Sequence, residues 1–416
     1  MAKLTKRELV LGGAALAAAP GLAAGQVYRT PGVYIEEIPS GLRAIQPLAT
    51  AETVLVTSFL AESKPARVRF MGELKGLVRP EGRPLVEGWA EAFFSHGGRS
   101  LYLFPAKDSS PDGLIGSAET LTGFEGLRRA GALWSPHWPG GEKPIHTGII
   151  IAPEVALLPD TADAASVYRI ATSVAESLAA LMLIDTPEVL NGVPFSTWTQ
   201  ARDWRAQLGI NNGHAALYGN RAVSTSGASR PITPSIAGVI ARTDVRRGVW
   251  KAPAGTEASL NHPITPLFAS AEEGVLNTEG VNICKDLPSL GPVVWGARTL
   301  SGNNEDRFIP VRRLRDHITQ SLRWGLQVLV AEPNEEPTWR AARAAAEGFL
   351  SGLFRNGAFP AASPNEAFFV RCGLGETMSQ ADIDQGRMII NVGFAPLKPA
   401  EFIVDRITFE GFAVTP

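Results

Sequence analysis

The chain has 416 residues, 45% of them hydrophobic and 19% charged, and this composition excludes a largely disordered protein. A single hydrophobic core stops growing at roughly 250–300 residues, so the length predicts at least two packed units. The 39 basic and 41 acidic residues give a net charge of −2, which argues against nucleic acid as a partner.

The first 25 residues have the layout of an export leader. Basic side chains within residues 1–7 precede an apolar stretch, 9–24, that is rich in small residues. Pro20 and Gly21 interrupt this stretch, and it is shorter than the ~20 residues that a membrane-spanning helix needs. Two interpretations remain open, namely a leader, either cleaved or retained as an anchor, and a helical or flexible arm.

Residues 39–235 alternate between strand-like and helix-like patterns. Continuous apolar segments predict strands that are buried on both faces, and the segments between them have the spacing of amphipathic helices. We expect a layered, mostly parallel α/β lobe, in which residues 187–230 form a polar insertion that contributes little to the core. Strands are predicted at 53–59, 101–104, 148–152 and 181–185, and helices around 89–94 and over 163–182.

Residues 236–400 predict an α+β unit. Apolar side chains recur at helical spacing from Val311 to Leu329, and a second helix is expected to begin at the N-cap residue Asn334 and to end at Gly357. We expect an antiparallel sheet packed on these two helices. Its strands are predicted at 368–372, 387–394 and 401–409.

The motifs that carry common chemistries are missing from the sequence. It has no phosphate-binding loop, no dinucleotide fingerprint, no HExxH pair and no GxSxG elbow. The two cysteines, Cys284 and Cys372, stand in apolar surroundings and are expected to be buried thiols, with a disulfide or a nucleophile as the alternatives. We therefore expect no catalytic, cofactor-binding or metal-binding residues, and no enzyme activity.

A short β-prone segment, 33–38, stands apart from both lobes between turn residues. Glu36 and Glu37 are adjacent, so on a strand they point to opposite faces and cannot converge on one substrate atom. The segment is better explained as an exposed edge strand whose charges limit wrong pairing.

Several blocks in the same order carry a resemblance to a known family. They are PGVYIEE at 31–37, ARTD at 241–244, RGVWKAP at 247–253, WGARTL at 295–300, EAFFVRC at 366–372 and PAEFIV at 399–404. Together they resemble the tail sheath proteins of contractile phages, whose relatives include R-type pyocins and extracellular contractile injection systems. The likeness spans residues 31–409 and is denser in the C-terminal half.

The resemblance implies a structural subunit that polymerises as a helix of six-subunit rings around an inner tube. The sheath then shortens and widens, which drives the tube through a target cell envelope. The implied partners are other sheath subunits, the inner tube protein, and baseplate and tail terminator proteins, without nucleic acid or a membrane unless the leader is an anchor. Assembly in the cytoplasm is implied, yet the leader-like segment leaves export open. The rival interpretations are an exported surface or binding protein and, more weakly, a secreted hydrolase.

In this family the terminal arms add strands to the sheets of neighbouring subunits. The resemblance assigns an N-terminal arm to residues 1–38 and a C-terminal arm to 401–416, with a sheath core domain at 236–400 and hinge ends at 30–32 and 396–399. The residues with this strand character are Val33, Tyr34, Ile35, Glu36, Phe402, Ile403 and Val404.

The tube contact is expected on the helix over 335–356. Its basic residues Arg340, Arg343 and Arg355 are candidates to meet acidic groups on the tube, and the alternative is a solvated face.

Overall fold

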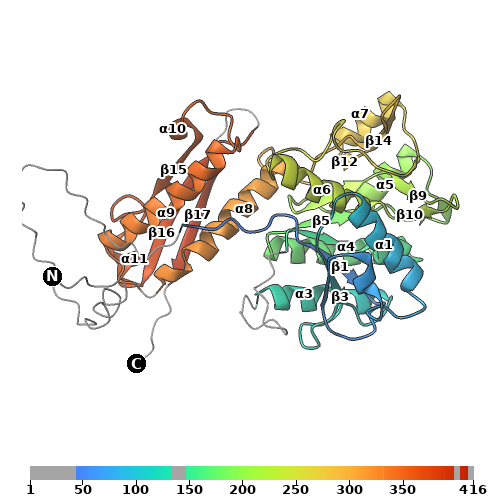
Figure 1. The fold of residues 1–416 in the computed structure, drawn as a ribbon, viewed down its shortest axis with the longest axis horizontal. Coiled ribbons are helices and arrows are strands. Elements are labelled where there is room, and N and C mark those ends of the chain that lie inside the picture. The colour runs from blue at the N-terminus through green and yellow to red at the C-terminus, as the bar shows by residue number, and fades with distance from the viewer. Residues whose placement is uncertain (1–43, 133–146, 331, 398–402, 411–416) are drawn as a thin grey trace, which may run out of the picture. The chain divides into compact units, whose positions relative to one another are not determined.

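A seven-stranded sheet with the order β12-β8-β5-β4-β1-β3-β2 forms the centre of the α/β lobe, residues 44–308 (Figure 1). Neighbouring strands are parallel except for β2, which runs antiparallel to β3 at one edge. The parallel arrangement confirms the predicted α/β pattern. The strands are β1 (Thr53–Thr57), β2 (Ala66–Val68), β3 (Leu101–Pro105), β4 (Ile149–Ile151), β5 (Leu181–Ile184), β8 (Ala215–Tyr218) and β12 (Val281–Asn282).

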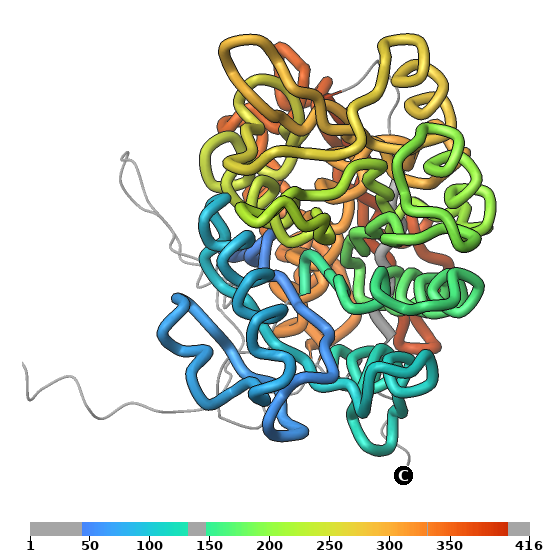
Figure 2. The backbone as a smooth tube through the Cα atoms, turned by 90° about the vertical axis from the view of Figure 1, so that its right-hand side faces the viewer, coloured from blue at the N-terminus to red at the C-terminus, as the bar shows by residue number. Residues whose placement is uncertain are grey.

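This computed structural model describes residues 44–132, 147–330 and 332–397, and the backbone of 403–410; the other residues are grey in Figure 2. The predicted strand at 33–38 and residue Phe402 lie outside the described residues. Within the described ranges, no helix is long and apolar enough to cross a membrane.

Helices cover both faces of the sheet because successive side chains of each strand point to opposite sides. In β1, Val54 and Val56 enter one apolar cluster and Leu55 enters the other. The first cluster is covered by α3 (Gly123–Ala132), α4 (Thr161–Ser177) and α5 (Trp198–Leu208), and the second by α1 (Arg83–Ser95) and α6 (Thr233–Arg247).

The C-terminal lobe, residues 309–410, is an antiparallel sheet packed on two helices, as the sequence predicts (Figure 1). Asn334 is expected from the sequence to cap the second helix, but the N-cap residue of that helix is Glu335. The Asn334 side chain instead donates to the Arg387 carbonyl at 3.1 Å and accepts from the Trp339 indole at 2.7 Å. The elements are α8 (Ile309–Gly325), α9 (Glu336–Arg355), β15 (Phe368–Arg371), β16 (Arg387–Phe394) and β17 (Ile403–Glu410).

Smaller elements complete the two lobes. Helical turns and short helices are η1 (Met71–Leu74), α2 (Pro111–Ile115), η2 (Pro153–Leu157), α7 (Ser270–Thr278), η3 (Gln327–Leu329), α10 (Pro364–Ala367) and α11 (Gln380–Asp384). Short antiparallel strands are β6 (Val189–Leu190), β7 (Val193–Pro194), β9 (Arg221–Val223), β10 (Ser229–Arg230), β11 (Ile264–Thr265), β13 (Cys284–Leu287) and β14 (Gly291–Val294).

The interpretation of residues 187–230 as a polar insertion is wrong. The segment contains β8, an inner strand of the sheet whose four residues are fully buried, and α5, whose Trp204 side chain is fully buried. The charged face of α5 and the turns around β8 dominate the composition and conceal a short apolar strand.

The expected division at residues 235–236 falls inside α6. This helix packs on the sheet through Ile236 and Ile240, and β12 adds a further strand to the same sheet. Residues 236–308 therefore contribute mainly to the lobe of the parallel sheet, and Val249 also enters the apolar cluster of the C-terminal helices. The helix expected over 163–182 also ends earlier, at Ser177, because Ala179 takes a left-handed conformation with φ of 51° before β5 begins.

Candidate assembly surfaces

Two of the predicted arm residues belong to the C-terminal sheet of their own chain. Ile403 and Val404 begin β17, which lies antiparallel to β16 of the same chain, with Ile403 opposite Phe394 and Val404 opposite Gly393. The pairing continues to Glu410 opposite Arg387, so β17 covers the whole length of β16. The remaining predicted strand residues, Val33, Tyr34, Ile35, Glu36 and Phe402, lie outside the described residues.

On its other side, β16 is only half covered by a strand. β15 pairs with Asn391–Phe394, and side chains occupy the backbone of the remaining half. The Thr377 hydroxyl donates to the Ile389 carbonyl at 2.7 Å, and the Asn334 amide donates to the Arg387 carbonyl. Since an unpaired strand edge invites another chain, these two side chains close that half of β16 to a further strand. No sequence pattern indicates these two contacts, because Asn334 and Thr377 have no fixed spacing to β16.

The three arginines of α9 differ in their exposure and in their contacts. Arg340 and Arg355 are exposed, and with Ala344 and Glu347 their spacing puts them on one face of the helix. Arg343 is used within the chain, because its guanidinium donates to the Cys372 carbonyl and pairs with Glu336 at 2.8 Å. Arg340 and Arg355 are thus available to a partner, whereas Arg343 holds the strand end of β15 against α9.

The carboxyl ends of the parallel strands are filled by the protein's own polar groups. In open α/β sheets, ligands bind at the crevice where the strand order reverses, which here lies beside β1 and β4. Glu154, directly after β4, is buried and accepts hydrogen bonds from the Thr57 hydroxyl and the Ser58 amide, both at 2.9 Å. Its carboxylate therefore occupies the position that a ligand takes in sheets of this kind.

Asp185, after β5, is a second carboxylate enclosed in the same way. It accepts from the backbone amides of Ile232 at 2.6 Å and Thr233 at 2.9 Å. Burial raises the pKa of Asp185, and the hydrogen bonds from Thr233 and Ile232 oppose that shift. These partners hold the beginning of α6 against the sheet, which is a structural role.

Both thiols of the chain are enclosed in the protein. Cys284 and Cys372 are free, buried thiols, which confirms the expectation, and burial raises the pKa of Cys372 to about 12. Such thiols stay protonated and unreactive at neutral pH. Among the described residues, no group of His, Cys, Asp or Glu side chains is placed to hold a metal ion.

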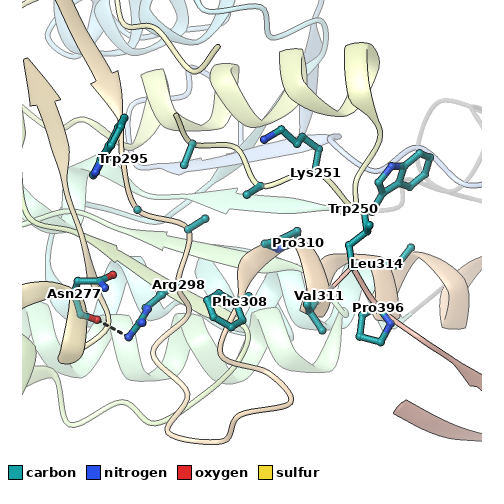
Figure 3. A pocket seen from close by; sticks show the side chains of 15 residues that line it. Trp250, Lys251, Asn277, Trp295, Arg298, Phe308, Pro310, Val311, Leu314 and Pro396 are labelled. Atoms are coloured by element: carbon teal, nitrogen blue, oxygen red, sulfur yellow. Dashed lines mark hydrogen bonds between the residues drawn. The ribbon is translucent and has the colours of Figure 1, made fainter. Parts of the chain in front are cut away.

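A groove of about 430 Å³ lies beside the start of α8 (Figure 3). Trp250, Trp295 and Phe308 line it together with Val311 and Pro396. Trp295 is 46% exposed although it is a large apolar side chain. An exposed patch of this composition is typical of an interaction surface.

The comparisons with known proteins agree on one kind of molecule. No protein-family model and no curated protein matches the sequence. Solved structures do match: the helical sheath of the anti-feeding prophage in its contracted state is 30% identical, with a TM-score of 0.65, and 91% of this chain covers 98% of that chain. The sheath complex of the extracellular contractile injection system PVC, in its contracted state, is 26% identical with a TM-score of 0.67, over 91% of this chain and 97% of that one.

A more distant structure shares the fold. The sheath tail protein of Listeria innocua is 10% identical with a TM-score of 0.57, over 90% of this chain and 98% of that chain. These matches identify a structural subunit of the kind that builds sheaths. With 30% identity over almost the whole of a solved sheath chain, the protein belongs to the contractile sheath family.

Proposed function

We propose that this chain is the sheath subunit of a contractile injection particle. It polymerises into a helical tube around an inner tube and contracts to drive that tube through a target envelope. The observation that carries the proposal is the family membership, supported by a C-terminal strand whose connection is suited to exchange between subunits.

The connection before β17 makes an exchange geometrically possible. Residues Ala395 to Phe402 separate the two paired strands, and eight residues reach at most about 26–29 Å. A strand exchanged between copies makes the same backbone bonds as in the closed chain, so the exchange costs little pairing energy. We therefore propose that β17 is the donated C-terminal strand and that it pairs with β16 of a neighbour in the particle.

The closed half of β16 directs where strands can be added. Asn334 and Thr377 block one side of Arg387–Ile390, so an incoming strand can replace β17 or lie along the outer edge of β15. Backbone pairing of this kind gives cohesion without specific side chains, at a net ~0.5–1.5 kcal/mol for each hydrogen bond. The N-terminal arm, residues 1–38, is proposed to take such an edge position in a neighbouring subunit.

For the inner tube we propose Arg340 and Arg355 as contact residues. Both are exposed on one face of α9. The ion pair that Arg340 forms within the described residues, to Glu336 at 4.0 Å, lies at the surface. Exposed pairs are weak, at about 0–1 kcal/mol, so this pair can be exchanged for an acidic group on the tube. Assembly in the cytoplasm, with baseplate and tail terminator proteins as further partners, belongs to the same proposal.

A disulfide experiment tests the exchange. Asn391 and Arg406 are opposite each other on β16 and β17, and cross-strand Cβ atoms lie about 4.5–5.5 Å apart, close enough for a disulfide. The double variant Asn391→Cys/Arg406→Cys is oxidised as a monomer and within assembled particles. We expect a link inside one chain in the monomer, and a ladder of linked chains from the particles.

The matched control uses the same cysteine at position 391. Arg371 lies opposite Asn391 on β15, so Arg371→Cys/Asn391→Cys should link within one chain in both preparations. If Asn391→Cys/Arg406→Cys also links only within one chain in the particles, the exchange of β17 is ruled out. The sheath role itself is tested by negative-stain microscopy, in which discrete monomers that persist in the presence of the tube protein would contradict it.

A further inference from the structure

A polar pocket of about 300 Å³ lies near the groove of Figure 3 and is lined by three arginines, Arg205, Arg298 and Arg307. Arg298 lines both hollows, since its guanidinium donates to the Asn277 carbonyl at 2.8 Å and lies over the Phe308 ring. The remaining lining comes from residues 278–280, which include the acidic Glu279, and from residues 299–302.

Within the part of the chain that the structure describes, none of the three guanidinium groups forms an ion pair. Burial lowers the pKa of Arg205, and the carboxylate of Glu279, which lines the same pocket, opposes this shift, whereas Arg298 and Arg307 have no such partner among the described residues. Arg205 donates to the carbonyl oxygens of Glu279 at 3.1 Å and Leu300 at 3.3 Å, which carry no net charge. The side chain of Arg307 makes no hydrogen bond or ion pair there. Burial and the repulsion of Arg307 lower the pKa of Arg298. Arginines gathered around one pocket repel each other, so the arrangement favours an anion between them.

The pocket sits at the amino ends of the parallel strands. Gly280 directly precedes β12, and the Leu300 amide donates to the carbonyl of Ala215, the first residue of β8, at 2.8 Å. Arg205 is on the last turn of α5, the helix that leads into β8. The three positive charges therefore mark one edge of the sheet, which we call the basic edge.

Carboxylates gather at the opposite edge, after the carboxyl ends of β3 and β4. Asp108 and Asp112 belong to the start of α2, and Asp160 and Asp163 to the start of α4, which packs against α2. All four are exposed and none forms an ion pair within the described ranges, and Lys107 is the only cation in the α2 loop from 106 to 110. We call this set the acidic edge.

Helix geometry explains the acidic edge in part. Acids in a first turn offset the helix dipole, and Asp160 also caps α4 by accepting from the Ala162 amide at 2.7 Å. The basic edge is only partly explained within the chain, because Glu279 offsets one of its three positive charges while Arg298 and Arg307 form no ion pair within the described residues. The unpaired arginines are thus the observation that points to a partner.

We propose that the basic edge, formed by Arg205, Arg298 and Arg307, is a binding site for carboxylates on the acidic edge of a second copy of this chain. The inference rests on the proposed sheath function. It adds a head-to-tail contact between α/β lobes to the exchange of strands in the C-terminal lobe.

The placement of the two edges suits an open polymer. A contact between different surfaces of identical subunits continues from copy to copy unless the rotation closes it into a ring, and it produces a helix when it does not. Opposite charges at the two ends of one sheet also fix the direction in which a subunit joins, because like edges repel. Charges of this kind are screened by salt, so assembly should weaken as ionic strength rises.

The test is a charge exchange in the full-length chain, assembled with the inner tube protein. Arg307→Glu changes a half-buried side chain that makes no hydrogen bond or ion pair within the described residues, so the subunit should fold normally. We expect the concentration at which half of the protein pellets as polymer to rise at least about tenfold. Asp163→Lys should have a similar effect. The combined variant restores opposite charges on the two edges and should assemble at a concentration near that of the wild type.

Arg323→Glu is the matched control, since Arg323 is an exposed arginine on α8 at neither edge. It should pellet like the wild type, and the thermal unfolding of each variant verifies its fold. Arg298→Gln provides a second variant that removes charge without reversing it, with the same direction of effect. The inference is overturned if Arg307→Glu pellets like the wild type, or if the combined variant is no better than its two parents.

Free anions are an alternative occupant with the same chemistry. Citrate and inorganic phosphate are therefore added to the monomer, and thermal unfolding is followed. If they stabilise the wild type but not Arg298→Gln while pelleting is unchanged in all variants, the pocket binds a small anion and the contact between copies is refuted. Polymers that form but ignore these substitutions contradict this inference alone, whereas the failure of every version, the wild type included, to form polymers contradicts the sheath function.

Discussion

Arg313 on α8 and Asp244 on α6 form an ion pair that is closed to water. Their Nη2 and Oδ2 atoms lie 2.6 Å apart, and each side chain is 4% exposed. Thr50 joins them, since its carbonyl accepts from Arg313 at 2.9 Å and its hydroxyl donates to Asp244 at 2.5 Å. One polar cluster thereby fixes three segments that are far apart in the sequence, and α8 continues from it into the C-terminal cluster through Leu314 and Ile318.

Removing one partner of this pair should be costly. Arg313→Met leaves the Asp244 carboxylate buried without its counter-charge, and breaking a buried pair in this way costs about 3–5 kcal/mol. We expect the free energy of unfolding, measured in urea, to fall by that amount. The double variant Asp244→Leu/Arg313→Met should recover most of the loss, because two apolar side chains replace both charges. A loss in Arg313→Met no larger than that of an exposed arginine, such as Arg323→Met, would contradict the prediction.

A buried histidine pair should make stability depend on pH. The ring of His96 lies 5.2 Å from that of His262, and its Nε2 accepts from the Asn261 amide at 3.1 Å, so the fold requires the neutral form. Burial lowers the pKa of His96 to about 4, with smaller contributions from His262 and Arg242, and the pKa of His262 is lowered in the same direction.

The direction of the change in stability with pH follows from proton binding to His96. Between pH 6.5 and about 4 the unfolded chain binds a proton at His96 and the folded chain does not, so stability falls as the pH falls through this window. A shift of this size corresponds to about 3 kcal/mol in all. His96→Gln should flatten the dependence in urea unfolding between pH 7 and pH 4.5. An equal slope in the wild type and in His96→Gln would show that His96 is not the group responsible.

Much of the fold follows from local pattern. The segment 148–152 predicts β4 because a short apolar segment rich in β-branched isoleucine is typical of a strand with both faces covered. The helix at α8 is predicted because Val311, Leu314, Ile318 and Leu322 recur on one side, and the structure buries all four. These elements carry their own signal, since the periodicity of a helix or a buried strand is independent of its partners.

The features that the sequence could not predict are those that depend on contacts between residues far apart in the chain. β8 and β12 are short strands of four and two residues, and they are recognised only by the sheet that they join. Arg205 and Arg298 are separated by 93 positions, so no sequence spacing predicts that they line one pocket. For the same reason Arg343 could not be separated from Arg340 and Arg355, because its role depends on the Cys372 carbonyl.

The arginines of α9 should divide into two classes. Arg343→Ala removes a charged hydrogen bond to the Cys372 carbonyl and should lower the free energy of unfolding by about 1.5–3 kcal/mol. Arg340→Glu/Arg355→Glu touches only the exposed face and should change stability by less than about 0.5 kcal/mol. The latter variant should instead lower the amount of inner tube that co-pellets with the sheath. Normal co-pelleting in Arg340→Glu/Arg355→Glu would exclude this face as the tube contact.

Deleting residues 1–38 should separate folding from assembly. The first residue packed into the described fold is Ile45, which is 7% exposed and lies against Gly325 of α8. The Leu48 amide then donates to the Ser321 hydroxyl at 3.2 Å. The deletion ends before these contacts, so we expect a folded monomer with an unchanged unfolding midpoint. Because the proposed N-terminal strand is lost, we expect no polymers by negative-stain microscopy.

Ile45→Ala in the full-length chain provides the opposite case. It keeps the N-terminal arm but empties a buried site, and truncation of a buried isoleucine costs about 2–5 kcal/mol. This variant should be less stable and still form polymers below its unfolding temperature. Normal tubes from the deletion would show that the N-terminal arm is not needed for assembly, and cohesion would then rest on β17 and the contacts between lobes.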